Sequence, residues 1–138
     1  MSSEFDGFLA SGAIKPSRFV SISSGNRGYV FQATASTPIV GVSKEGTFYP
    51  PGTAADTGDA GIDGLPVPIY APHRTCLIKL GGTVSAGDRL TADASGQGVK
   101  LDITATGHSY VGGIVLDNGT SGGLVRMFIN PFEGVMSN

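Results

Sequence analysis

Hydrophobic residues along this chain mostly occur at every second position, in short runs bounded by glycine, proline, serine and asparagine. This alternation is typical of strands that are buried on one face. The clearest example is residues 18–34, where two alternating runs flank a turn. It predicts a β-hairpin with Val20 and Ile22 on one face. Further strands are expected at residues 38–42, 69–80 with a break at Pro72, 84–92, 99–103, 110–116 and 123–130.

The last of these strands is expected to end at Pro131, because proline cannot donate a hydrogen bond to a neighbouring strand. No segment shows a long helical period of about 3.6 residues that is free of glycine. The chain has 138 residues, which is the size of a single domain. We therefore predict an all-β fold, a small β-barrel or sandwich.

The chain is expected to have three parts: an extended N-terminal arm at residues 1–16, a β domain at 17–131 and a C-terminal tail at 132–138. The β domain contains a long Gly/Pro-rich loop at 49–68, and loops of this length in compact domains are normally functional or mobile. Candidate anchors on a neighbouring subunit or partner are the large apolar residues of the two ends: Phe5, Phe8, Leu9, Phe132, Val135 and Met136. The alternative is that both ends are frayed.

Charge and cysteine content narrow the function classes. Charged residues make up 14% of the chain, against about 25% in typical proteins, which leaves much neutral surface to bury against a partner. The net charge is −2 and the basic residues are scattered singly, which argues against nucleic acid as a partner. No apolar run approaches the roughly 20 residues of a membrane span, and the polar N-terminus is unlike an export signal.

The single cysteine, Cys76, excludes an intrachain disulfide and is expected to be buried in a strand.

Candidate catalytic and metal-binding residues are sparse. The Asp-Thr-Gly triplet at 56–58 matches that of aspartic peptidases, but it does not follow the buried strand that their chemistry needs. Three carboxylates could gather a calcium ion, although at spacings unlike those of the EF-hand: Asp56, Asp59 and Asp63. His73 and His108 lack a third ligand at recognisable spacing. We therefore expect no enzymatic activity, no cofactor and no metal.

Residues 83–90 (Thr-Val-Ser-Ala-Gly-Asp-Arg-Leu) predict a tight turn followed by a short strand. Gly87 permits the backbone angles of such a turn, and the Asp88 carboxylate can accept hydrogen bonds from nearby backbone N–H groups. A similar turn occurs in domains that carry biotin or lipoate. Those domains place a lysine on an exposed hairpin, and Lys100 has no such setting here.

Taken in order, several segments resemble the small capsid decoration proteins of tailed bacteriophages, also called cement or head-stabilising proteins. The matching segments are the N-terminal arm, the hairpin near 19–31, the turn and strand at 83–90 with the turn at 93–98, the run Val-Gly-Gly-Ile-Val-Leu at 111–116, and a closing strand that ends near Ile129. The resemblance implies a β-barrel or β-tulip body without an active site or cofactor. It also implies a homotrimer at three-fold positions on the outer surface of the virion, where it clamps neighbouring major capsid protein subunits.

On this interpretation, the candidate contacts with the capsid or a sister subunit are Phe5, Phe8, Leu9, Tyr49, Phe132, Val135 and Met136. The alternative function is an outward-facing host- or carbohydrate-binding β module. Such a module would present aromatic side chains on one exposed face, and the candidates are Tyr29, Tyr49, Tyr70 and Tyr110.

Overall fold

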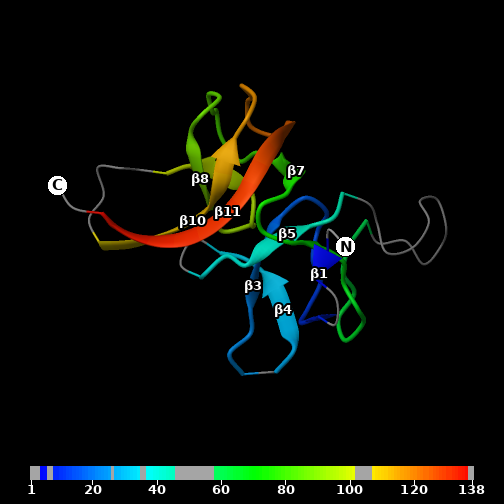
Figure 1. The fold of residues 1–138 in the computed structure, drawn as a ribbon. Coiled ribbons are helices and arrows are strands. Elements are labelled where there is room, and N and C mark those ends of the chain that lie inside the picture. The colour runs from blue at the N-terminus through cyan, green and yellow to red at the C-terminus, as the bar shows by residue number, and fades with distance from the viewer. Residues whose placement is uncertain are drawn as a thin grey trace.

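The computed structural model describes residues 4–5, 8–25, 27–34, 37–45, 58–101 and 107–136, and this part of the chain forms eleven strands and no helix. The strands form two sheets, one built mainly from the N-terminal half of the chain and one from the C-terminal half (Figure 1). The prediction of an all-β fold is therefore confirmed. Within the same residues there is no helix of the length and hydrophobicity needed to cross a membrane.

The N-terminal sheet has six strands in the order β1-β6-β5-β3-β4-β2. Their bounds are Glu4–Phe5 (β1), Leu9–Ala10 (β2), Phe19–Ile22 (β3), Tyr29–Gln32 (β4), Gly41–Ser43 (β5) and Ile69–Tyr70 (β6). All neighbours are antiparallel except β2 and β4. The sheet curls back on itself, because the segment just before β6 forms bridges to the segment around β2: Pro66 with Leu9, Asp63 with Ala10 and Gly61 with Ile14.

The C-terminal sheet has five antiparallel strands in the order β7-β11-β10-β8-β9. Their bounds are Thr75–Lys79 (β7), Arg89–Ala92 (β8), Gly98–Lys100 (β9), Gly107–Val115 (β10) and Leu124–Met136 (β11). The expected turns join them: Gly87 has a φ of 95°, and Ser85 donates its backbone N–H to the Asp88 carboxylate at 2.9 Å.

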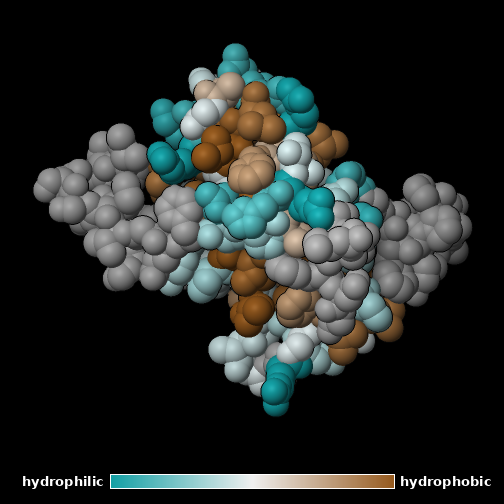
Figure 2. All heavy atoms as spheres, viewed as in Figure 1, coloured by the Kyte–Doolittle hydropathy of each residue, from teal (hydrophilic) through white to brown (hydrophobic). Residues whose placement is uncertain are grey.

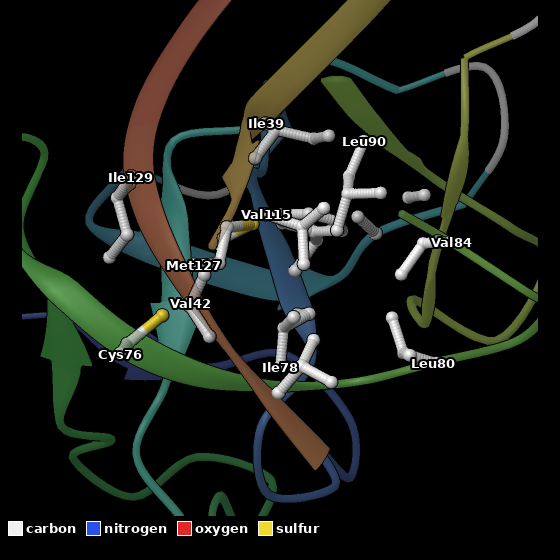
Figure 3. Close-up of a cluster of buried hydrophobic side chains, with 14 residues drawn as sticks. Ile39, Val42, Cys76, Ile78, Leu80, Val84, Leu90, Val115, Met127 and Ile129 are labelled. Atoms are coloured by element: carbon white, nitrogen blue, oxygen red, sulfur yellow. The ribbon is translucent and has the colours of Figure 1, made fainter. Parts of the chain in front are cut away.

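Two hydrophobic cores hold the sheets. The first lies between them, where Val42 and Ile39 from the N-terminal half meet side chains of β7, β8, β10 and β11 (Figure 3). The second lies inside the curl of the N-terminal sheet and consists of Ala10, Ile14, Val20, Val30, Val67 and Ile69. Strand β3 serves both, because its successive side chains point to opposite faces: Phe19 belongs to the first core and Val20 to the second.

The predicted hairpin at 18–34 is confirmed by the antiparallel pairing of β3 with β4. Ile22 lies opposite Val30 in the register, yet its side chain is 51% exposed. It is the last residue of β3, where the strand passes the rim of the second core. The alternation therefore predicted its face correctly but not its exposure.

The expectation that Pro131 ends the last strand is wrong. Strand β11 continues through Pro131 to Met136, and residues 132–136, which we assigned to a tail, pair with β10. The register shifts between the pairs Val111–Phe132 and Gly113–Ile129, so that one residue of β10 faces two of β11. Pro131 is one of those two. A β-bulge leaves a residue without a ladder partner, and proline is tolerated there because its missing N–H costs no hydrogen bond.

The segment predicted as an N-terminal arm is in part a component of the N-terminal sheet. Strand β1 pairs with β6, strand β2 pairs with β4, and Ile14 is completely buried. Residues 58–68 of the predicted long loop pack against this segment, and Lys15 forms an ion pair with Asp59 at 2.8 Å. The earlier part of that loop, with Tyr49, lies outside the described residues.

Candidate functional site

One described hollow that is lined mainly by apolar groups is an open groove of about 450 Å³. It forms where the two sheets meet, and its lining comes from the residue before β2, the end of β3, the approach to β5, the link between β6 and β7, and the bulge of β11. The lining residues are Phe8, Ile22, Ile39, Val40, Pro72, His73, Asn130 and Pro131. We call this feature the apolar groove.

The apolar groove has a fixed wall on the side of the link between β6 and β7. His73 has a φ of 67°, a conformation uncommon outside glycine, and its backbone N–H donates to the carbonyl of Ile129 at 2.7 Å. Its ring centroid lies 6.0 Å from that of Phe128. Apart from this imidazole, no titratable side chain is found among the described residues that line the groove. Its surface therefore suits the burial of apolar groups from another polypeptide better than the chemistry of proton transfer.

A second, smaller hollow of about 270 Å³ carries charges: it is lined by Lys15, Pro16, Ser17, Arg18, Glu45, Gly58, Lys79 and Leu124. Two of its three cations, Lys15 and Arg18, have partners within the chain. Lys15 is paired with Asp59, and the Arg18 guanidinium donates to the carbonyl of Pro16 at 2.8 Å. Burial lowers the pKa of Arg18, which the nearby Asp93 partly offsets. These contacts give Lys15 and Arg18 a structural role around this hollow.

The hairpin between β10 and β11 exposes two leucines. Leu116 is 40% and Leu124 is 52% exposed. In the same hairpin, the Arg126 guanidinium donates to both oxygens of Asp117, at 2.8 and 3.0 Å. These bonds, with a third from the Arg126 backbone N–H, hold the pKa of Asp117 down at about 2 and raise that of Arg126. The hairpin thus exposes two apolar side chains close to a hydrogen-bonded ion pair.

Hydrophobic residues gather in two areas of the face shown in Figure 2, separated by a band of hydrophilic ones. This face is therefore a mixture of apolar patches and polar borders. Patches of this kind mark interaction sites more often than catalytic ones.

Of the residues that the sequence suggested as contacts, Phe8 lies in the apolar groove. Phe8 packs against the second core and also lines the apolar groove, which Pro131 borders from β11. Phe5 lies in β1 and Leu9 in β2, both within the N-terminal sheet. The three C-terminal candidates lie in β11: Phe132, Val135 and Met136. The groove itself, to which Ile39 and Pro72 contribute, was missed, because its residues come from five separate segments.

Two of the three carboxylates considered for calcium, Asp59 and Asp63, have partners within the chain. Asp59 is paired with Lys15, and the Asp63 carboxylate accepts a hydrogen bond from the backbone N–H of Gly12 at 2.8 Å. Asp56 lies outside the described residues. In the part of the chain that the structure describes, no three His, Cys, Asp or Glu residues are grouped so as to hold a metal ion. Cys76 is buried as predicted, and burial, with a contribution from Glu45, raises its thiol pKa to about 12.

Fold and surface together define a small all-β domain of two packed sheets with an apolar groove at their junction. No protein-family model matches the chain, and no curated protein matches it. Among solved structures, the chain is similar to the N base of the head fiber gp8.5 of bacteriophage phi29. The TM-score is 0.63 and the sequence identity 20%, over 92% of this chain and 92% of that one. At this identity the likeness concerns the fold.

Proposed function

We propose that this protein is a structural protein of a phage head, without enzymatic activity. In this proposal it binds the outer surface of the capsid as a trimer at three-fold positions and holds neighbouring major capsid protein subunits together. The observation that supports it most is the likeness in fold to the base of a phage head fiber, which spans nearly the whole of both chains. The resemblance of the sequence to capsid decoration proteins points the same way.

The surface of the domain is consistent with this role. Apolar side chains are exposed at two separate places, the apolar groove around Ile22 and the hairpin tip with Leu116 and Leu124. A clamp must contact more than one subunit at a time, and two linked weak contacts give an avidity roughly 10²–10⁴ above that of one. Three copies around a symmetry axis multiply each patch again.

The experiment uses expanded capsids of the parent virus that lack this protein. Purified protein is added, and binding is measured by co-sedimentation and capsid stability by differential scanning calorimetry. The proposal predicts saturable binding and a higher melting temperature of the capsid. The double variant Leu116→Asp with Leu124→Asp is expected to weaken binding, because charges replace two exposed apolar contacts. A folded wild-type protein that does not sediment with these capsids at saturating concentration would contradict the proposal.

A second candidate function is an outward-facing host- or carbohydrate-binding module, which the description of the neighbour as part of a fiber favours. The described tyrosines give it little support. Tyr70 and Tyr110 pack against the first core, and the Tyr70 hydroxyl donates to Glu45 at 2.9 Å. Tyr29 in β4 is half-buried. Binding of the purified protein to a glycan array, competed by free sugar, would favour this second function over the first.

A further inference from the structure

Apolar side chains cover part of the outward side of the C-terminal sheet. Alternate side chains of its strands, such as Ile78 and Met127, enter the first core, so the residues between them face outward. The apolar residues that face outward, which together we call the outer face, are Leu77, Ile114, Leu116, Leu124 and Phe128. None of these five side chains is buried. Antiparallel sheets that pack on one side are usually polar on the other, so the outer face marks a contact surface.

The outer face is continuous across three strands. Phe128 of β11 lies opposite Ile114 of β10. Arg126, which lies between Leu124 and Phe128 along β11, is opposite Leu77 of β7. Side chains at opposite positions of neighbouring strands are close enough to touch. The apolar residues therefore form one surface that extends to β7, the strand at the edge of the sheet.

Strand β7 leaves backbone groups unpaired along this edge. Backbone hydrogen bonds to the β11 side immediately before and after β7, at 2.8 and 2.9 Å, fix which of its residues bond to β11. Since these bonds alternate in an antiparallel pair, Thr75, Leu77 and Lys79 point their backbone groups away from β11. The Lys79 N–H accordingly donates to the carbonyl of Ser17, at 3.0 Å. In the part of the chain that the structure describes, the outward backbone groups of Thr75 and Leu77 have no partner.

An edge of this kind is completed by a strand of another chain, and charge indicates which kind of strand. Arg74 immediately precedes β7 and Lys79 ends it, so two cations bracket the unpaired groups. Among the described residues, neither cation has a carboxylate partner. The same edge of a second copy would bring four such cations together, which is unfavourable. A strand that carries carboxylates would instead supply their missing partners.

We propose that β7 and the outer face bind an extended acidic segment of another polypeptide, which joins the sheet as an additional strand beside β7. Its backbone bonds to the outward groups of Thr75 and Leu77, and its apolar side chains continue the outer face beside Leu77. Its carboxylates meet Arg74 and Lys79. These two cations are about 17 Å apart along an extended strand, so the segment spans roughly five residues. That the polypeptide is the major capsid protein rests on the proposed function.

The first test removes one outward N–H group. Leu77→Pro is compatible with the fold, because proline is tolerated in an edge strand where the N–H points away from the sheet. Lys100→Pro is the matched control in β9, the opposite edge, where the neighbouring Leu101 is the residue that bonds to β8. Circular dichroism and thermal melting check that both variants are folded. In co-sedimentation with expanded capsids of the parent virus, Leu77→Pro is expected to bind about tenfold more weakly and Lys100→Pro as wild type does.

The second test reverses the two charges and does not depend on the folding of a proline variant. The double variant Arg74→Glu with Lys79→Glu is expected to bind capsids about tenfold more weakly than wild type. Lys100→Glu is the control, because its partner in the ladder is Leu90, a residue of the first core, and Lys100 thus lies outside the outer face. Capsid binding by the folded double variant that equals that of wild type would overturn the inference, and so would equal binding by folded Leu77→Pro.

A third measurement separates this inference from the proposed function. If wild type does not bind capsids, the function is contradicted, and binding of a synthetic peptide, Glu-Val-Thr-Val-Glu, to the nitrogen-15-labelled protein decides the inference. We expect saturable NMR shifts of the Thr75 and Leu77 amides, and none with Lys-Val-Thr-Val-Lys. No shift of these amides, or equal shifts with both peptides, would overturn the inference. Wild-type oligomers that Leu77→Pro dissociates would assign the edge to a second copy and would also overturn it.

Discussion

The ring of Phe19 fills the space beside Gly112 that a side chain at that position would need. A Cβ atom on Gly112 would lie 2.6 Å from Phe19 Cζ and closer still to Cε1. Phe19 is fully buried in β3 of the N-terminal sheet, and Gly112 lies in β10 of the C-terminal sheet. The absence of a side chain at one position thus lets the two sheets approach each other through an aromatic ring.

Gly112→Ala is expected to destabilise the protein by about 1–3 kcal/mol, the usual cost of overpacking a core. The measurement is urea unfolding followed by circular dichroism. Gly82→Ala is a matched control, because a Cβ there would meet only Val99, at an ordinary 3.9 Å. In a Phe19→Leu background, which removes part of the ring, the cost of Gly112→Ala should fall. Equal costs in both backgrounds would show that the Phe19 contact is not the cause.

Ile14→Ala is expected to lower the free energy of unfolding by about 2–5 kcal/mol, because the side chain is completely buried in the second core. Ala13→Ser, at the exposed neighbouring position, is the control and should have little effect.

Truncation of the N-terminal segment is expected to destabilise the protein for the same reason. Deletion of residues 1–12 removes β2 and is expected to lower the melting temperature of the protein itself. A truncated protein as stable as wild type would contradict the role of this segment in the fold.

The Asp117–Arg126 pair predicts a stability change in acid. Arg126 depresses the pKa of the Asp117 carboxyl from 3.8 to about 2. The stabilisation is therefore fully present above the ordinary value and is lost as the pH falls toward about 2. Asp117→Asn should melt at a lower temperature than wild type at pH 6, and the gap should narrow between pH 4 and pH 2 in steps that follow this titration.

Carbon-13 NMR of the Asp117 carboxyl should give a titration midpoint near 2 in wild type. In Arg126→Gln the midpoint should rise, because the donating guanidinium is gone. An unchanged midpoint in Arg126→Gln would show that another group causes the shift.

The Cys76 thiol is expected to be unreactive in the folded protein. It is buried and its pKa is raised to about 12, so the thiolate that attacks disulfide reagents is scarce at pH 8. Ellman's reagent should report one thiol per chain in denaturant and a much slower reaction without it. Rapid reaction of the native protein would contradict the buried position of Cys76.

Local features of the fold were predictable from the sequence. The hairpin at 18–34 and the turn at Asp93 follow from short-range chemistry: the Asp93 carboxylate accepts hydrogen bonds from the backbone N–H groups of Ser95 and Gln97, at 2.8 and 2.9 Å. Such contacts join residues only a few positions apart. Turn-forming residues and alternation are enough to indicate them.

Long-range features were not predictable in this way. The bridge between Ile14 and Gly61 joins segments far apart in the sequence, and nothing in either segment specifies its partner. A proline such as Pro131 can either end a strand or occupy a β-bulge. Which of these occurs depends on the register of β11 with β10, and the local sequence does not reveal that register. The apolar groove depends on several such pairings at once, so its residues could be recognised as apolar but not as neighbours.

Strand β3 places Phe19 in one core and Val20 in the other. Opening the first core would expose Phe19, and opening the second would expose Val20. Because both residues belong to β3, the packing of each core helps to hold the strand in place for the other. The two halves are therefore expected to melt cooperatively, as a single calorimetric transition, with the slowest amide hydrogen exchange in β3. Unfolding of either half by heat or by mechanical force would therefore require the packing of both cores to be broken.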